Sequence, residues 1–261
     1  LLFKCRKNGN LKNISTKLGD FVRTNSEAIL GIKLKKTPKE DFTKGVAISS
    51  GFHPDNDTHI ETVRYGQGQN AMALLTTFLP DRNIPLPGFI RWGISVVRSP
   101  FQFITNFFPF GWAKKTIILL VMQPLNNYLK LTYKSRWWRL GKFSMNSFSD
   151  KGEEIPSHIP IGEKTAKNIM KKTGGIVMST YMDSIFGIPT TAHILGGACL
   201  SKNIDSGVVD ENFEIFNYPD LYVIDGSAIP SNLGVNPSLT ITAMAEYAMS
   251  KFPESDKKIM N

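Results

Sequence analysis

The sequence predicts a mixed α/β (α+β) fold, in which a mixed or antiparallel sheet is flanked by helices. Apolar or alternating runs of strand length recur through the middle of the chain. Two stretches with helical periodicity and recognisable start or stop residues follow in the second half. With 261 residues, of which 41% are hydrophobic, the chain is long enough to bury a core in one large or two small domains.

The strands are predicted from β-rich runs. Residues 46–65 predict a hairpin, because two such runs flank the turn-forming Pro-Asp-Asn-Asp sequence at 54–57. The continuous apolar run at 116–122 predicts a buried strand. Alternating residues at 128–133 and 143–148 predict two more strands joined by an exposed turn.

The helices are predicted from periodicity and end signals. Residues 71–79 have helical character, and 162–172 form an amphipathic stretch stopped by two glycines. A last helix fits 237–252, with Asn236 as its N-cap and proline at its first position. The aromatic-rich segment 89–110 predicts two short helices that are too interrupted to span a bilayer. They are either part of the core or the wall or lid of an apolar substrate pocket.

The charge is uneven along the chain. The formal net charge is +9, and residues 1–44 hold eleven basic side chains against four acidic ones. A nucleic-acid partner is not expected, because no aromatic side chains are interleaved with these lysines for base stacking. A solvated basic surface is favoured, and a lipid headgroup is the alternative anionic partner.

Two further features bear on location. The two cysteines are not in a Cys-x-x-Cys pair, so neither a disulfide framework nor a redox pair is expected. The chain starts at Leu1 without a signal peptide, and we interpret this start as an interior point of a longer protein that is cytoplasmic by default.

A histidine and an asparagine near the C-terminus are the main candidates for chemistry. His193 precedes a Gly-Gly turn, and Asn236 opens the last helix. Taken singly, each has a structural explanation: His193 can be a hydrogen-bonded histidine of the core, and Asn236 can be the N-cap of the helix. A hydrolase triad of His193, Asp225 and Ser227 is disfavoured, because the chain has no Gly-x-Ser-x-Gly sequence.

A metal site is not expected. His53, His59 and Glu61 are the residues that suggest one, but their spacing does not match the usual ligand patterns, and His59 and Glu61 simply share one strand face.

Taken together, these motifs resemble one family. From Gly19 onward the chain resembles the C-terminal half of glucose-methanol-choline (GMC) flavin oxidoreductases, most of all their cholesterol-oxidase-like branch. The segments that carry the resemblance are His193–Gly197, Gly207–Asp210, Leu221–Ser227, Ile229–Pro230, Gly234–Ile241 and Ala245–Glu246. One departure is Ile194, where the family often has proline.

The resemblance implies a domain arrangement. Residues 1–44 would end an FAD-binding domain, 45–190 would form the substrate-binding domain with its sheet and oily helical insertion, and 191–261 would return to the FAD domain. The family's N-terminal Gly-x-Gly-x-x-Gly unit is not present in the sequence, so we expect the remaining half of the FAD site to be a partner region of the same protein.

The resemblance also implies roles for individual residues. His193 and Asn236 would face the substrate hydroxyl over the flavin ring, where a histidine can hold or remove the O–H proton near neutral pH. The last helix would direct its positive end at the flavin. The implied FAD-binding residues are Asp225, Gly226, Asn236, Pro237 and Ser238.

Glu61 is a third catalytic candidate. It falls where cholesterol oxidases carry a glutamate that moves a proton during double-bond isomerisation. A surface carboxylate on a hairpin is the alternative explanation.

The expected function is therefore oxidation of a CH–OH group of a sterol or another bulky apolar alcohol by hydride transfer to FAD, with transient contact to a membrane surface. Two alternatives remain open: a non-catalytic sterol-binding or lipid-binding fragment, and a flavin alcohol dehydrogenase that uses an acceptor other than oxygen.

Overall fold

A computed structural model describes residues 1–137, 140–149 and 155–252. The chain divides into two compact units. We call residues 25–125 and 155–192 the sheet unit, and residues 1–24, 126–154 and 193–261 the motif unit. The confirmed fold class is mixed, with helices and antiparallel strands.

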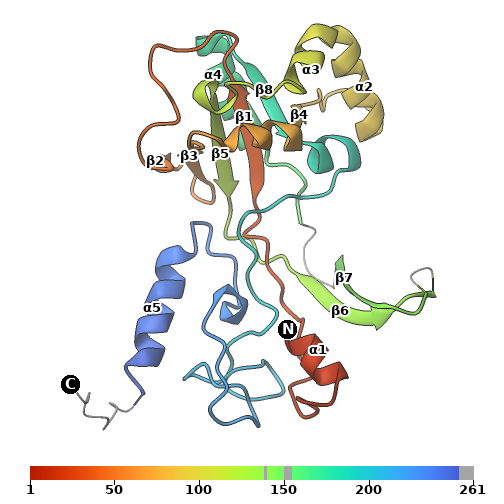
Figure 1. The fold of residues 1–261 in the computed structure, drawn as a ribbon, viewed down its shortest axis with the longest axis vertical. Helices are drawn as coiled ribbons and strands as arrows, with labels where there is room; N and C mark the ends of the chain where they lie inside the picture. The colour runs from red at the N-terminus through yellow and green to blue at the C-terminus, as the bar shows by residue number, and fades with distance from the viewer. Residues whose placement is uncertain (138–139, 150–154, 253–261) are drawn as a thin grey trace. The chain divides into compact units, whose positions relative to one another are not determined.

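The sheet unit is built on a six-stranded sheet in the order β2-β3-β5-β1-β8-β4, and every neighbouring pair in it is antiparallel (Figure 1). Its strands are β1 (Ala28–Lys33), β2 (Ile48–Phe52), β3 (His59–Val63), β4 (Thr76–Phe78), β5 (Thr116–Met122) and β8 (Ile176–Thr180). The hairpin and the strand at 116–122 are confirmed. Strand β8 was not predicted from the sequence.

Helix α4 (Pro160–Thr173) covers one face of this sheet. Its Ala166 packs with alternate residues of the central strands, such as Leu30 and Leu119, because successive side chains on a strand point to opposite faces. The opposite face holds a second apolar cluster around Trp112, Ile118, Leu120 and Met122. The two faces of one sheet are thus buried against different neighbours.

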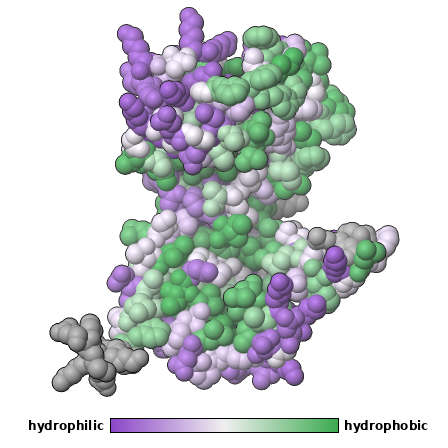
Figure 2. All heavy atoms as spheres, viewed as in Figure 1, coloured by the Kyte–Doolittle hydropathy of each residue, from purple (hydrophilic) through white to green (hydrophobic). Residues whose placement is uncertain are grey.

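The segment predicted as two short helices forms α2 (Gly88–Arg98) and α3 (Pro100–Asn106). Its interpretation as a core segment is wrong, because Asn106 is the one fully buried residue of the two helices. Several of their large apolar side chains, among them Phe89, Val97 and Phe101, are exposed instead, and they form a hydrophobic surface in Figure 2. The prediction of a helix at 71–79 is also wrong in part. A 3-10 helix spans Gln69–Leu75. Thr76–Phe78 form a strand instead, because their backbone pairs with the edge of β8.

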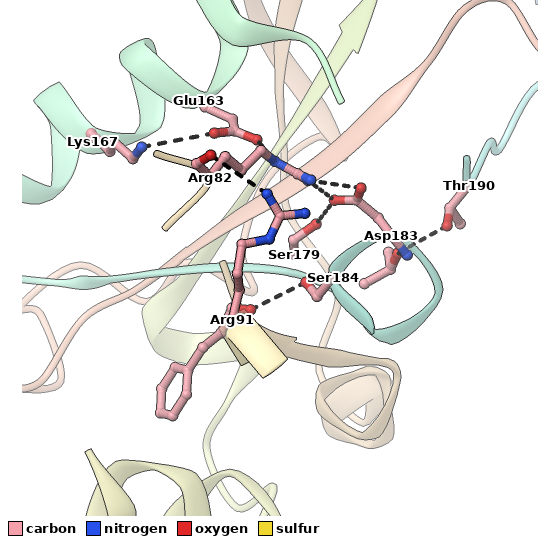
Figure 3. Close-up of polar contacts among 10 residues, drawn as sticks. Arg82, Arg91, Glu163, Lys167, Ser179, Asp183, Ser184 and Thr190 are labelled. Carbon is pink, nitrogen blue, oxygen red and sulfur yellow. Dashed lines mark hydrogen bonds and ion pairs between the residues drawn. The ribbon is translucent and has the colours of Figure 1, made fainter. Parts of the chain in front are cut away.

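A buried charge network ties α4 to the region after β8 (Figure 3). The Arg82 guanidinium donates to Glu163 Oε1 at 2.5 Å and to both carboxylate oxygens of Asp183 at 2.8 and 2.9 Å. Ser179 Oγ also donates to Asp183. Burial disfavours the Arg82 cation, but Asp183 and Glu163 outweigh it and raise the Arg82 pKa. The network therefore keeps three buried charges paired.

The motif unit contains few regular elements and many turns. They are α1 (Leu2–Lys7), the antiparallel pair β6 (Leu129–Ser135) and β7 (Phe143–Ser149), a 3-10 turn at Gly226–Ala228, and α5 (Ser238–Met249). The two strands and the last helix are confirmed, whereas α1 was missed. The segments 207–210 and 221–225 take part only in isolated bridges, because this part of the chain turns again after every few residues.

The core of the motif unit packs segments that are far apart in the sequence. Ile14, Val208, Ile215 and Ala248 lie in one apolar cluster. Among the described residues, no helix is long and apolar enough to cross a membrane.

Candidate functional site

Two of the sequence motifs meet in the motif unit through backbone hydrogen bonds. The amide of Gly196 donates to the carbonyl of Gly226 at 2.9 Å, and the amide of Ala198 donates to the carbonyl of Ser227 at 2.9 Å. The segment that begins at His193 therefore runs beside the Asp-Gly-Ser turn, although about thirty residues separate them in the chain.

A glycine is needed where the His193 segment turns. Gly196 has φ +73°, and a Cβ at this position would lie 1.9 Å from the carbonyl oxygen of Phe21. One residue earlier, the backbones of Leu195 and Arg23 exchange hydrogen bonds of 2.7 and 3.0 Å. His193 itself is half-buried at the start of this tightly held segment.

The start of α5 adjoins the same turn. A Cβ on Gly226 would lie 3.5 Å from Cδ1 of Ile241, which is in the first half of the helix. The prediction that Asn236 caps the helix is wrong by one position, because Pro237 occupies the N-cap and no side chain there accepts a capping hydrogen bond. The amides of the first turn of α5, including the amide of Ser238, therefore have no hydrogen bond to the side chain of the N-cap residue.

Asp225 belongs to a turn and also lines a hollow. Its Oδ1 accepts hydrogen bonds from Ser227 N at 2.8 Å and Ser227 Oγ at 2.5 Å, which closes the 3-10 turn. Gly196, Gly197 and Asp225 are among the residues that line a hollow of about 410 Å³ within the motif unit. Asp225 therefore binds Ser227 locally and presents an exposed carboxylate beside this hollow.

Arg23 is a buried cation that the sequence analysis did not single out. Its guanidinium donates to Asn126 Oδ1 at 2.9 Å, to the Asn127 carbonyl at 2.9 Å and to the Pro230 carbonyl at 3.0 Å. Burial lowers the pKa of Arg23, while Cys199 and Tyr128 oppose the shift. Only the fold could reveal this residue, since its three partners come from two distant segments.

Glu61 lies in the sheet unit, whereas His193 and Asn236 lie in the motif unit. The Glu61 side chain is 10% exposed and its Oε1 is 2.9 Å from Nε2 of His59. Glu61 pairs with Leu120 of β5, so it is on the sheet face opposite α4. The alternative of a surface carboxylate does not fit this burial.

An apolar hollow of about 320 Å³ opens on that same face of the sheet. Its walls are almost entirely apolar side chains with a few hydroxyl groups, a composition typical of pockets for small apolar ligands. The lining residues are Ile29, Tyr65, Met72, Leu74, Leu75, Thr76, Trp112, Ile118, Thr180, Tyr181, Met182 and Thr190.

A second buried carboxylate, Glu27, holds the chain just before His193. Its Oε2 accepts hydrogen bonds from Thr191 Oγ1 at 2.8 Å and from Ala192 N at 2.9 Å. Burial and the nearby Glu27 charge raise the pKa of Tyr65. Glu27 was not singled out from the sequence.

The described part of the chain contains no group of three or more His, Cys, Asp or Glu side chains arranged to hold a metal ion. His53, His59 and Glu61 lie together, but they are joined by hydrogen bonds.

Comparison with known proteins shows what the chain is similar to. Residues 154–245 match the family described as GMC oxidoreductase. The cholesterol oxidase of Mycobacterium tuberculosis is 43% identical over 99% of this chain and 46% of its own length. That of Acinetobacter baumannii is 40% identical over 97% of the chain and 45% of its own. A long-chain-alcohol oxidase of Arabidopsis thaliana is 38% identical over 39% of the chain and 15% of its own.

Residues 154–245 therefore correspond to the C-terminal domain of the GMC oxidoreductases, a family whose members are generally flavoproteins. Within that family the chain is similar to cholesterol oxidases along nearly its whole length, which confirms the resemblance inferred from its motifs. The chain spans about half the length of these curated relatives, 46% and 45%.

Proposed function

We propose that this chain is the C-terminal part of an FAD-dependent enzyme that oxidises the CH–OH group of a sterol or another bulky apolar alcohol. The observation that carries the proposal is the 43% identity to a cholesterol oxidase along 99% of the chain. The apolar hollow on the sheet supports an apolar substrate, and the partial similarity to a long-chain-alcohol oxidase agrees with that substrate class.

The residues of the motif unit fit an FAD site. The first turn of α5 has no side-chain cap, so its amides suit an acceptor group that gains negative charge. Asp225 and the glycines at 196 and 197 line a hollow, where backbone without side chains lets a ligand approach closely. The proposed FAD-binding residues are Asp225, Gly226, Asn236, Pro237 and Ser238.

In this proposal His193 and Asn236 act on the substrate oxygen. His193 accepts the hydroxyl proton, and the Asn236 amide holds the oxygen in place as the carbonyl forms. When bound, FAD supplies the acceptor for the hydride that leaves the same carbon. Gly196 and the Arg23–Leu195 backbone pair fix the segment that carries His193.

Glu61 is proposed to move a proton during double-bond isomerisation. Its carboxylate is buried on the sheet face that also bears the apolar hollow. For a 3-oxo steroid with a 5,6 double bond, Glu61 removes a proton from C4 and returns one to C6, so the net proton balance is zero.

The experiment uses the full-length protein that contains this chain. Flavin absorbance measures cofactor content, and oxygen consumption is compared with dye reduction on a panel of sterols and long-chain alcohols. His193→Gln should lower kcat by about 10²-fold or more with flavin retained, because general acid–base catalysis contributes that much. His158→Gln, a histidine in the sheet unit, is the matched control.

Three outcomes contradict parts of the proposal. Full turnover in His193→Gln removes the assigned role of that residue. Sterol binding without turnover supports a non-catalytic lipid-binding protein. Dye reduction without oxygen consumption identifies a dehydrogenase with another acceptor.

We also propose that the hydrophobic surface over α2 and α3 makes transient contact with a membrane. Phe101, Phe108 and Phe110 are 74%, 63% and 83% exposed. They share a hollow of about 480 Å³ with Lys33 and Lys115, and aromatic and basic side chains together suit an anionic lipid interface.

Vesicle co-sedimentation tests this contact. Phe101→Ser with Phe110→Ser should weaken binding to vesicles of phosphatidylcholine with phosphatidylserine. Phe52→Ser, which removes a 43% exposed phenylalanine from β2 at the opposite edge of the sheet, should not. Equal binding by all variants contradicts the proposed surface.

A further inference from the structure

A line of hydrogen bonds runs from an exposed histidine to Glu61. Nε2 of His53 is 3.0 Å from Nδ1 of His59, and Nε2 of His59 is 2.9 Å from Oε1 of Glu61. The two imidazole rings lie 4.5 Å apart between centroids. Each histidine thus uses a ring nitrogen toward its neighbour, and His59 uses both.

Solvent exposure decreases along this line from His53 through His59 to Glu61. His53 is exposed, whereas the side chains of His59 and Glu61 are 14% and 10% exposed. The line therefore joins solvent at one end to a buried carboxylate at the other.

Gly51 makes room for the middle histidine. It pairs with Glu61 across the hairpin, and a Cβ on it would lie 2.8 and 2.9 Å from Cε1 and Nε2 of the His59 ring. Gly51 does not have a positive φ, so the backbone conformation does not demand glycine here. The absence of a side chain instead allows the His59 ring to lie over β2 and reach Glu61.

The strands beside the line contribute no competing charge. Neither β2 (Ile-Ser-Ser-Gly-Phe) nor β5 (Thr-Ile-Ile-Leu-Leu-Val-Met) contains a titratable residue. On the hairpin itself, Asp55 accepts a hydrogen bond from the amide of Asp57, and Arg64 donates to the Lys44 carbonyl.

We propose that His59 and His53 form a proton relay between Glu61 and solvent. This inference rests on the proposed role of Glu61 as the group that moves a proton of the substrate. His59 and His53 are positioning and relay residues and do not touch the substrate in this account.

The relay conserves protons at every step. Protonated Glu61 gives its proton to Nε2 of His59, and the proton on Nδ1 of His59 passes to Nε2 of His53. His53 then releases the proton on its own Nδ1 to water. One O–H or N–H bond breaks and one forms at each transfer. In the reverse sequence water protonates Nδ1 of His53, the proton on Nε2 of His53 returns to Nδ1 of His59, and the proton on Nε2 of His59 returns to Glu61.

The relay changes the origin of the proton that reaches C6. Without exchange, Glu61 delivers to C6 the proton that it took from C4. With the relay, the proton from C4 passes to Nε2 of His59, and exchange of this ring N–H with solvent before the return step places a solvent proton on Glu61. Turnover in D2O should therefore place deuterium at C6 of the isomerised product, which mass spectrometry and NMR of the product measure.

Variants separate the relay from simple structural support. In the full-length protein, His59→Gln keeps a hydrogen-bonding side chain but cannot pass a proton, so deuterium at C6 should fall by about tenfold. Gly51→Ala should lower it as well, because the added Cβ displaces the His59 ring. His53→Ala should lower it, and added imidazole should restore it because the site is exposed. His158→Gln is the control and should match the parent protein.

A second measurement does not require turnover. The chain contains four histidines, so ring-nitrogen NMR signals can be assigned with single His→Gln variants. Glu61→Gln and His53→Gln should each shift the ring-nitrogen signals of His59, whereas His158→Gln should not. If neither variant shifts the His59 signals, the proposed line of hydrogen bonds is wrong.

The outcomes distinguish the relay from the function beneath it. Unchanged deuterium content in His59→Gln overturns the relay while leaving Glu61 as the proton-moving group. If the protein oxidises sterols but never isomerises them, the role of Glu61 fails, and the relay fails with it as a catalytic device. NMR coupling among the three side chains would then remain a structural property alone.

Discussion

The two units of this molecule hold their chains in place by different means. The sheet unit relies on antiparallel ladders, two apolar faces and buried ion pairs around Arg82. The motif unit relies on turns, isolated bridges and backbone hydrogen bonds between distant segments. The comparison teaches that regular backbone ladders order the first unit, whereas turns and single backbone hydrogen bonds between distant segments order the second.

The largest expected effect concerns the charge network of the sheet unit. Arg82→Met leaves the buried carboxylates of Glu163 and Asp183 without their cation, so the free energy of unfolding should fall by about 3–5 kcal/mol. Lys167→Met, which removes a lysine that is 43% exposed, should change it by less than about 1 kcal/mol. Urea denaturation measures both. A similar loss in the two variants would show that the network does not stabilise the unit.

The next effect concerns a turn of the motif unit. Gly196→Ala combines a left-handed φ with a Cβ 1.9 Å from a carbonyl oxygen, so it should cost about 2–3 kcal/mol. Gly174 of the sheet unit has φ +67° and open space around its Cβ position, and Gly174→Ala should cost about 1 kcal/mol. If the two variants lose the same free energy of unfolding in urea denaturation, the close approach to the Phe21 carbonyl does not add to the cost of Gly196→Ala.

The third prediction concerns Glu27, which accepts hydrogen bonds from the end of the sheet unit just before His193. Glu27→Gln weakens the hydrogen bonds from Thr191 and Ala192 and should lower stability by about 1–2 kcal/mol. Loss of the charge should also bring the pKa of Tyr65 closer to 10.0, since Glu27 helps to raise it. Phenolate absorbance during an alkaline titration measures this change. A Tyr65 titration that is the same in both proteins would contradict it.

The smallest effect is a pH dependence in the sheet unit. Burial, followed by the Arg82 cation, lowers the pKa of His158 below 6.5. The unfolded chain therefore binds a proton first as the pH falls below 6.5, and stability declines from there down to the folded-state pKa. His158→Gln should flatten this part of a plot of melting temperature against pH. An unaltered plot would assign the decline to other groups.

The difference between the units also explains what the sequence could predict. The strands β5, β6 and β7 were predictable because apolar or alternating patterns of strand length mark them directly. Strand β4 was taken for helix, because the three residues Thr76–Phe78 carry no pattern and pair only when β8 is beside them. Pairing with β8, and not the local sequence, therefore makes this segment a strand.

The candidate site was predictable only in part. His193, Asn236 and Asp225 stand in recognisable motifs, so the family resemblance pointed to them. No local pattern marks Arg23 or Glu27, because their partners are one hundred or more residues away. The roles given to His193, Asn236 and Glu61 stay predictions until the proposed variants are measured.

The position of β2 at the edge of the sheet has one more consequence. All five of its residues are exposed, its single neighbouring strand is β3, and its pairing shifts register between Ile48 and Ser50. Such an edge opens more readily than the central strands, so its amide hydrogens should exchange with deuterium first. Each opening would carry His53, which directly follows β2, away from the His59 ring. The lifetime of one short ladder thus sets how long the path between Glu61 and water stays intact.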